Sequence, residues 1–171
     1  KAAGWTDIKC IEIAGVQGDQ TNTARMNGYK AGVEEAGGTF LSDEVQYADA
    51  TADRATTAME AIMQTHPEGI AIICANNDDM AAARAAQGHD AYKNTIFLGF
   101  NGDRAACEAI LAGQMTMSVA QMAYEMGYKA VETMVQVLDG ETVDEFVDSG
   151  SDVVTPDNAQ ERLDTLKTQL H

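Results

Sequence analysis

Residues 73–83, ICANNDDMAAA, place two amides and two carboxylates between an apolar run and a helical pattern. Such a cluster could cap a helix, bind a metal ion, take part in catalysis or hold a polar ligand. Asn77 is placed to cap the helix that follows, and Asp78 and Asp79 would then lie near the positive end of its dipole. Capping accounts for the carboxylates and leaves open what the amides of Asn76 and Asn77 contact.

The residue spacing does not indicate a metal site. On a helix, the adjacent carboxylates of Asp78 and Asp79 diverge by roughly 100 degrees, so they do not converge on one ion. The histidines have no ligand spacing between them. The three histidines are His66, His89 and His171. The sequence therefore predicts no bound metal ion and no cofactor.

The familiar catalytic motifs are also missing from the sequence. No GxSxG motif occurs, and no serine or cysteine at a predicted strand end has an evident histidine partner. Residues 15–22, GVQGDQTN, have two glycines and no following GK[ST], and Asp19 would repel phosphate. A hydrolase that uses two catalytic carboxylates is an alternative, because the chain has so many acids, although nothing in the sequence selects one pair. We predict that the chain is not an enzyme.

The composition is that of a globular domain with a strong negative charge. The chain has 171 residues, of which 45% are hydrophobic and 22% charged, so it can bury a sizeable core. Its 27 acidic and 11 basic residues give a net charge of −16, which makes nucleic acids and anionic membranes poor partners. The same charge would also simply keep a soluble protein dispersed. No run of eighteen apolar residues occurs, so no span of a bilayer is predicted.

The cysteines indicate neither a disulfide framework nor a cysteine zinc site. Cys10, Cys74 and Cys107 show no CxxC spacing. Cys10 and Cys74 lie within apolar runs, where a thiol usually behaves as a small hydrophobic side chain.

Strand-like and helix-like segments alternate along the whole chain. The run IAIIC at 70–74 is continuously apolar, which is typical of a strand buried on both faces. This alternation predicts an α/β fold with a doubly wound, mainly parallel sheet flanked by helices. The predicted strands are 8–13, 39–47, 70–74, 95–100, 115–120 and 151–155, and the predicted helices are 23–38, 51–65, 77–87, 103–112, 121–139 and 156–170.

In open sheets of this kind, ligands bind beyond the carboxyl ends of the strands. The segments that follow the predicted strands are rich in amides, acids and glycine, and Arg25 lies near the start of one helix. Amides, carboxylates and an arginine match a ligand that carries many hydroxyl groups, because each hydroxyl both donates and accepts. A solvated surface charge is the alternative interpretation of Arg25.

Four stretches carry a family resemblance: GVQGDQTNTARMNGYKAGVEEAG, MQTHPEGIAIICANNDDMAAARAAQ, FLGFNGDRAACEAILAGQMTMSVAQ and VVTPDNAQ. Their order resembles the ribose-binding-protein group of type I periplasmic sugar-binding proteins of ABC transporters. Members have two doubly wound lobes that close on a sugar. The chain resembles the C-terminal lobe, with most of the N-terminal lobe missing, and its start reads like the end of a helix begun upstream. The resemblance implies a ligand-binding lobe at 1–114, a hinge strand and helix at 115–140, and a tail strand and helix at 141–171.

The resemblance also implies ligand-binding residues. The arginine after the first strand falls on Arg25, the asparagine of the ND motif on Asn77, the acid of the GFDG motif on Asn101, and the glutamine that ends the hinge strand on Gln121. Asn22 is a further candidate.

Two departures from the family pattern bear on the ligand. Asn101 replaces an aspartate that would accept hydrogen bonds from sugar hydroxyls, and its amide can also donate. A different hydroxyl pattern, or a ligand that bears an acceptor at this point, is therefore expected. The aromatic residue that would stack on the sugar should lie near Ala50 or Thr51, and neither is aromatic, although Tyr47 is close. Both departures count against ribose itself as the ligand, and the sequence does not identify the sugar.

The resemblance implies a solute-binding component that captures a monosaccharide or related polyol by closing two lobes and delivers it to a transporter permease. Its location would be extracytoplasmic, in a periplasm or as a cell-surface lipoprotein of a Gram-positive bacterium. The alternative is the effector-binding lobe of a LacI-type transcriptional regulator, although such regulators usually read GFDD where this chain reads GFNG. A sugar-sensing receptor ectodomain is a third interpretation.

The predicted helix 121–139 carries Met122, Met126 and Met134 at helical spacing. Packing in the core is the simplest interpretation of this stripe. The family fold places the helix in the other lobe, so the stripe would be partly uncovered here. We therefore expect a partner surface there, such as a dimer contact of the fragment.

Overall fold

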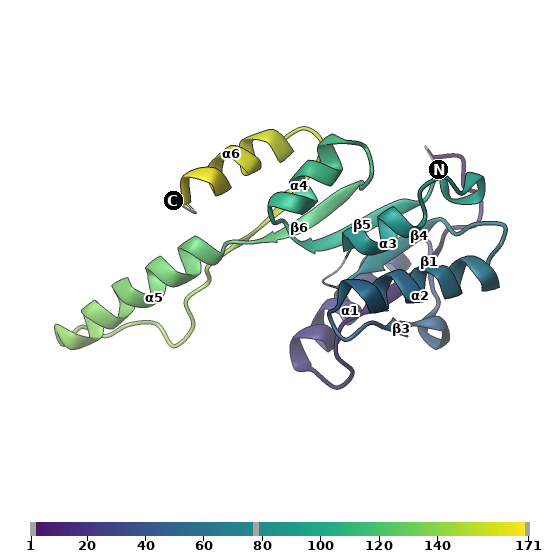
Figure 1. The fold of residues 1–171 in the computed structure, drawn as a ribbon. Helices are drawn as coiled ribbons and strands as arrows, with labels where there is room; N and C mark the ends of the chain where they lie inside the picture. The colour runs from purple at the N-terminus through teal and green to yellow at the C-terminus, as the bar shows by residue number, and fades with distance from the viewer. Residues whose placement is uncertain (1–2, 77–78, 170–171) are drawn as a thin grey trace.

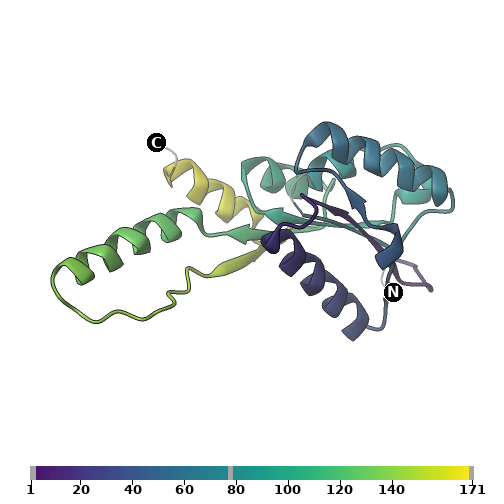
Figure 2. The ribbon, with the colours of Figure 1, turned by 90° about the horizontal axis from the view of Figure 1, so that it is seen from below.

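The computed structural model describes residues 3–76 and 79–169, which form a seven-stranded sheet with helices on both faces (Figures 1 and 2). The strand order is β2-β1-β4-β5-β6-β7, and β3 pairs with β1 beside β2. All pairings are parallel except that of β7 with β6, so the predicted doubly wound, mainly parallel α/β fold is confirmed. The strands are β1 Lys9–Ala14, β2 Thr39–Phe40, β3 Gln46–Tyr47, β4 Ile72–Ala75, β5 Ile96–Asn101, β6 Met117–Gln121 and β7 Ser151–Val154.

Helix α1 covers one face of the sheet, and α2 lies on the opposite face (Figure 2). Helix α6 returns after β7 and packs beside α4, where Ala159 and Leu163 enter the core (Figure 1). The helices are α1 Gln20–Glu35, α2 Ala52–Thr65, α3 Asp79–Ala85, α4 Arg104–Leu111, α5 Ala123–Leu138 and α6 Ala159–Gln169, and two short 3-10 helices span Ser42–Glu44 and Asp90–Tyr92.

The two faces of the central strands carry separate hydrophobic clusters. Ile11 and Ile13 of β1 pack on one face, with Met59 and Ile62 of α2. The alternate residue Cys10 points to the other face, beneath α1. Because both faces of β4 are covered, its sequence is continuously apolar instead of alternating, whereas β1 carries Glu12 among its apolar residues.

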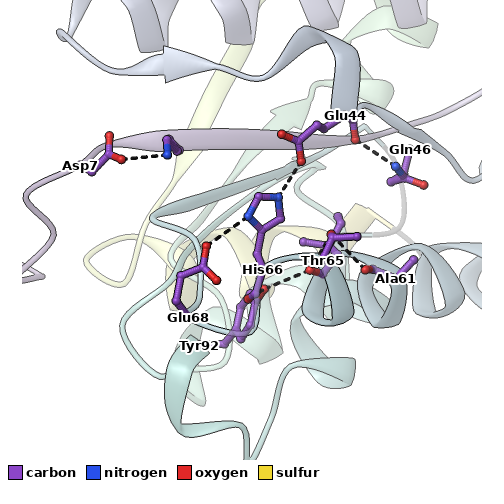
Figure 3. Close-up of polar contacts among 10 residues, drawn as sticks. Asp7, Glu44, Gln46, Ala61, Thr65, His66, Glu68 and Tyr92 are labelled. Carbon is purple, nitrogen blue, oxygen red and sulfur yellow. Dashed lines mark hydrogen bonds and ion pairs between the residues drawn. The ribbon is translucent and has the colours of Figure 1, made fainter.

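The prediction of one continuous strand at 39–47 is wrong for the residues in its middle. The chain forms the two short strands β2 and β3, separated by the 3-10 helix Ser42–Glu44. This turn lets Glu44 reach the end of α2, where its Oε2 lies 2.6 Å from Nε2 of His66, while Nδ1 of His66 lies 3.4 Å from Oε1 of Glu68 (Figure 3). The contact is between segments distant in sequence, so the apolar pattern of 39–47 does not reveal it.

Helix α5 extends away from the sheet, and the segment that follows it runs back along it to β7 (Figure 1). No residue of α5 is buried, and Met126 and Met134 are about half exposed. The interpretation that the methionine stripe packs in a core therefore does not hold within the described residues. No helix in the described ranges combines the length and apolar character needed to cross a membrane.

Candidate ligand-binding site

Strands β1, β4, β5 and β6 are parallel, so the segments that follow them meet at one edge of the sheet. A pocket of about 420 Å³ lies at this edge, between the start of α1 and the start of β7. Its size suits a small ligand. The lining residues include Thr21, Ala24, Arg25, Phe100, Gln121 and Ser151.

The turn from β1 into α1 is held by polar side chains. Asp19 caps α1 by accepting a hydrogen bond from the backbone N–H of Asn22 at 2.7 Å. The Oδ1 atom of Asn22 accepts from the N–H of Gly15 at 2.6 Å and from Nδ2 of Asn76 at 2.7 Å. Asn22 is 4% exposed, so the structure places this candidate beneath the site. Its side-chain oxygen Oδ1 forms its hydrogen bonds inside the protein.

Arg25 is fixed at the wall of the pocket. Its Nη1 atom donates to the backbone carbonyl of Asn76 at 3.1 Å and to Oδ1 of Asn76 at 2.9 Å. Its guanidinium carbon lies 3.8 Å from the centroid of the Phe100 ring, which is a cation–π contact. Burial lowers the pKa of the Arg25 guanidinium, an effect that Tyr29 and Asp19 oppose. A guanidinium held in this way can present donors to a ligand without reorienting.

Asn76 connects this arginine to a buried acid. The side chain of Asn76 is 1% exposed, and its Nδ2 atom also lies 3.3 Å from Oε1 of Glu12. Glu12 is fully buried in β1, and within the described residues its Oε2 atom has no hydrogen-bond partner. Burial raises the pKa of the Glu12 carboxyl to about 7, and the hydrogen bond from Asn76 opposes this rise.

Asn101 and Gln121 form the other side of the site. Nε2 of Gln121 donates to Oδ1 of Asn101 at 2.5 Å, so these two candidates are brought together at the ends of β5 and β6. Asn101 has a φ of 97°, and the next residue, Gly102, has a φ of 56°. A side chain on Gly102 would collide with the Cβ of Ala120 at 2.4 Å, so only glycine fits the turn that follows Asn101.

Arg162 of α6 supports the same turn from outside. Its Nε atom donates to the carbonyl of Gly102 at 3.3 Å, and its Nη2 atom donates to the carbonyl of Gln121 at 3.0 Å. These bonds tie the C-terminal helix to the ends of β5 and β6. Arg162 therefore positions the backbone that carries Asn101 and Gln121.

The remaining predictions on site residues have different outcomes. Asn77 lies outside the described residues, so the structure does not place it. Tyr47 lies at the end of β3 and is 39% exposed. Asp49 and Ala50, which follow β3, form a turn in which both residues have positive φ angles. Among the described residues, no group of three or more histidines, cysteines or acids could hold a metal ion.

A family model described as a periplasmic binding protein domain matches residues 2–142. The chain belongs to this periplasmic binding protein family. The ribose import binding protein RbsB of Escherichia coli K12 is 31% identical over 138 residues, which cover 79% of this chain and 45% of the relative. The periplasmic binding protein domain described here thus spans about half the length of the relatives that it matches.

Solved structures show the same fold. A galactofuranose binding protein superimposes with a TM-score of 0.82 at 20% identity, over 96% of this chain and 57% of that protein. An ABC transporter solute binding protein from Mycobacterium smegmatis, with bound glycerol, superimposes with a TM-score of 0.76 at 28% identity, over 94% of this chain and 56% of that protein. These comparisons confirm the resemblance to type I periplasmic sugar-binding proteins.

Four residues that build this periplasmic binding protein site had been given no role from the sequence. Glu12 could have been found, since it is the single acid inside the apolar strand, and Asn76 directly follows a buried strand. Phe100 and Arg162 gave no signal, because the contact of each with the site joins segments far apart in the chain.

Proposed function

We propose that the chain is part of the solute-binding component of an ABC transporter and that it binds a monosaccharide or related polyol between two closing lobes. Residues 1–114 would form the ligand-binding lobe, 115–140 the hinge strand and helix, and 141–171 the tail. The observation that supports this most strongly is the pocket in which Arg25 lies against Phe100, next to Gln121. A fixed guanidinium, amides and an aromatic ring are the groups that bind polyols.

Each site residue has a role in this proposal. Arg25 would donate hydrogen bonds to ligand oxygens, and the amides of Asn101 and Gln121 would exchange hydrogen bonds with neighbouring hydroxyls. Asn77 would contribute its amide, and Asn22 would act from beneath by holding Asn76. The amide of Asn101 can donate as well as accept, so we expect a hydroxyl pattern different from that of ribose.

The proposal extends to compartment and partner. Relatives such as the ribose import binding protein are binding proteins of transporters and not enzymes, and we propose the same for this chain. Its location would be extracytoplasmic, and its macromolecular partner would be the permease of the transporter. None of the relatives named above is a transcriptional regulator, so these comparisons give that alternative no support.

Replacing Arg25 with alanine should weaken sugar binding by about 1–3 kcal/mol, because a charge-assisted hydrogen bond to the ligand is lost. The measurement is a titration of the 15N-labelled chain and of the variant with D-ribose, myo-inositol and glycerol, followed by NMR. The matched control is Arg54→Ala, which removes the same charge from an exposed position on α2. Equal affinity of the Arg25→Ala variant and the wild-type chain would contradict the assignment of Arg25.

We further propose that the chain alone dimerises through Met122, Met126 and Met134. Met126 and Met134 are exposed and line an apolar pocket of about 380 Å³ between α5 and the segment that returns from it. Met122 lies at the margin, where its sulfur is 3.6 Å from Nη1 of Arg162. An apolar surface of this kind is a typical protein–protein interface.

Analytical ultracentrifugation tests the dimer. The wild-type chain should sediment as a dimer, and the double variant Met126→Glu, Met134→Glu should sediment as a monomer, because burying two carboxylates in an interface is costly. Ala61→Glu, on the exposed side of α2, is the matched control and should remain dimeric. A wild-type chain that is monomeric at all concentrations would refute the contact.

A further inference from the structure

Two of the three cysteines lie side by side in the sheet although they are 64 positions apart in the sequence. Cys10 is on β1 and Cys74 is on the neighbouring strand β4, and their Sγ atoms are 3.3 Å apart. In the parallel register Cys10 pairs with Ile72 and Glu12 pairs with Cys74, so the two cysteines are diagonal neighbours. Both are fully buried, in the cluster that α1 covers.

We propose that Cys10 and Cys74 are a site of disulfide formation that links β1 to β4. A disulfide bond is about 2.0 Å long, so the sulfurs need to approach by about 1.3 Å, which requires rotation of both side chains and a movement of the strands. Each thiol loses its proton as the bond forms between the two Sγ atoms. The two electrons reduce an added disulfide, such as oxidised glutathione, to two thiols.

The bond is expected to form while the strands pair during folding. In the folded chain both thiols are shielded from solvent. The hydrogen bond with Cys10, together with burial, raises the pKa of the Cys74 thiol well above its ordinary value, so the thiolate that would attack an oxidant is scarce. Before α1 covers the sheet, neither restriction applies. The oxidant should therefore be present during refolding.

Cys107 provides an internal comparison. It is buried on α4, in the hydrophobic cluster on the opposite face of the sheet, and its Sγ lies near the carbonyl of Gly102. The sheet separates it from Cys10 and Cys74. The chain should therefore lose two of its three thiols on oxidation and keep the third.

The link would also change stability. It closes a long loop, which restricts the unfolded chain, so the oxidised chain should unfold at a higher urea concentration than the reduced chain. Formation of the bond in the cell depends on an extracytoplasmic location, which is part of the proposed function. Formation in vitro does not depend on that function or on any sugar.

The test is to refold the chain from urea in a glutathione redox buffer and, in parallel, in dithiothreitol. Free thiols are then alkylated with N-ethylmaleimide in denaturant and counted by intact mass. We expect one label per chain after oxidising refolding and three after reducing refolding. Peptide mapping should join the Cys10 peptide to the Cys74 peptide, and the urea midpoint should be higher for the oxidised chain.

Each of the following results would overturn the proposal: three labels after oxidising refolding, a glutathione adduct in place of the bond, or a disulfide that contains Cys107. An oxidised chain with a lower urea midpoint would do the same. The variant Cys107→Ser keeps the pair intact and should carry no label after oxidation and two after reduction. The variant Cys10→Ser should carry two labels in both buffers. If that variant does not fold, the thiol count of Cys107→Ser decides.

Discussion

Replacing Glu12 with glutamine should make the stability of the chain less dependent on pH. The free energy of unfolding of the Glu12→Gln variant, minus that of the wild type, should increase by about 2–3 kcal/mol from about pH 5 to pH 8. The carboxyl of Glu12 has its pKa raised from 4.5 to about 7 in the folded chain, chiefly by burial. Between these two values the folded state holds a proton that the unfolded state has lost. The wild-type chain therefore loses stability as the pH rises through this window, and a neutral glutamine does not.

The measurement is urea unfolding of both proteins across this pH range. Glutamine can still accept the hydrogen bond from Asn76, but its amide N–H₂ has no evident partner near the position of Oε2. That cost changes the stability at every pH, so the readout is how the difference between the proteins varies with pH. Glu34→Gln, on the exposed side of α1, is the control and should show little variation. If the difference in free energy of unfolding between Glu12→Gln and the wild type stays constant across the pH range, the raised pKa of the Glu12 carboxyl is contradicted.

Replacing Gly102 with alanine should destabilise the chain by about 2–4 kcal/mol. The new methyl group would lie 2.4 Å from the Cβ of Ala120 and 2.6 Å from its Cα, and the φ of 56° adds strain for any residue with a side chain. The neighbouring strand β6 cannot move aside freely, because Arg162 holds the carbonyls of Gly102 and Gln121. Relief of the clash would displace Asn101 and Gln121, so sugar binding should also weaken.

Urea unfolding checks this prediction, with Gly32→Ala as the matched control. Gly32 lies on the exposed side of α1, and an added Cβ there meets nothing within 4 Å. That variant should gain about 0.5–1 kcal/mol, since alanine is the better helix former. Equal stability of Gly102→Ala and the wild type would show that the turn after Asn101 is not restricted to glycine.

Much of the fold could be predicted from the sequence, because local patterns decide it. The apolar runs at β4 and β5 marked strands covered on both faces, and the glycines after α1 and α4 marked helix ends. The interrupted edge at 39–47 could not be predicted in the same way. The 3-10 helix there brings Glu44 to His66, and these two residues meet only in the folded chain.

The candidate site was predictable to a similar extent. The rule that ligands bind at the carboxyl ends of strands pointed to the region of Arg25, Asn101 and Gln121, and the structure brings them to one edge of the sheet. The sequence could not show what holds them there. The positions of Asn76 and Glu12 beneath Arg25 depend on the pairing of β1 with β4.

Titration of the 15N-labelled chain with D-ribose, myo-inositol and glycerol, followed by NMR, tests whether this lobe binds a sugar or polyol at the candidate site. One lobe supplies only part of the contacts, so we expect a dissociation constant in the millimolar range, which NMR detects. We expect saturable shifts for at least one of these compounds, confined to residues around Arg25, Asn101 and Gln121. No saturable shift up to about 50 mM, or shifts confined to a distant surface such as the exposed side of α2, would contradict the proposed site.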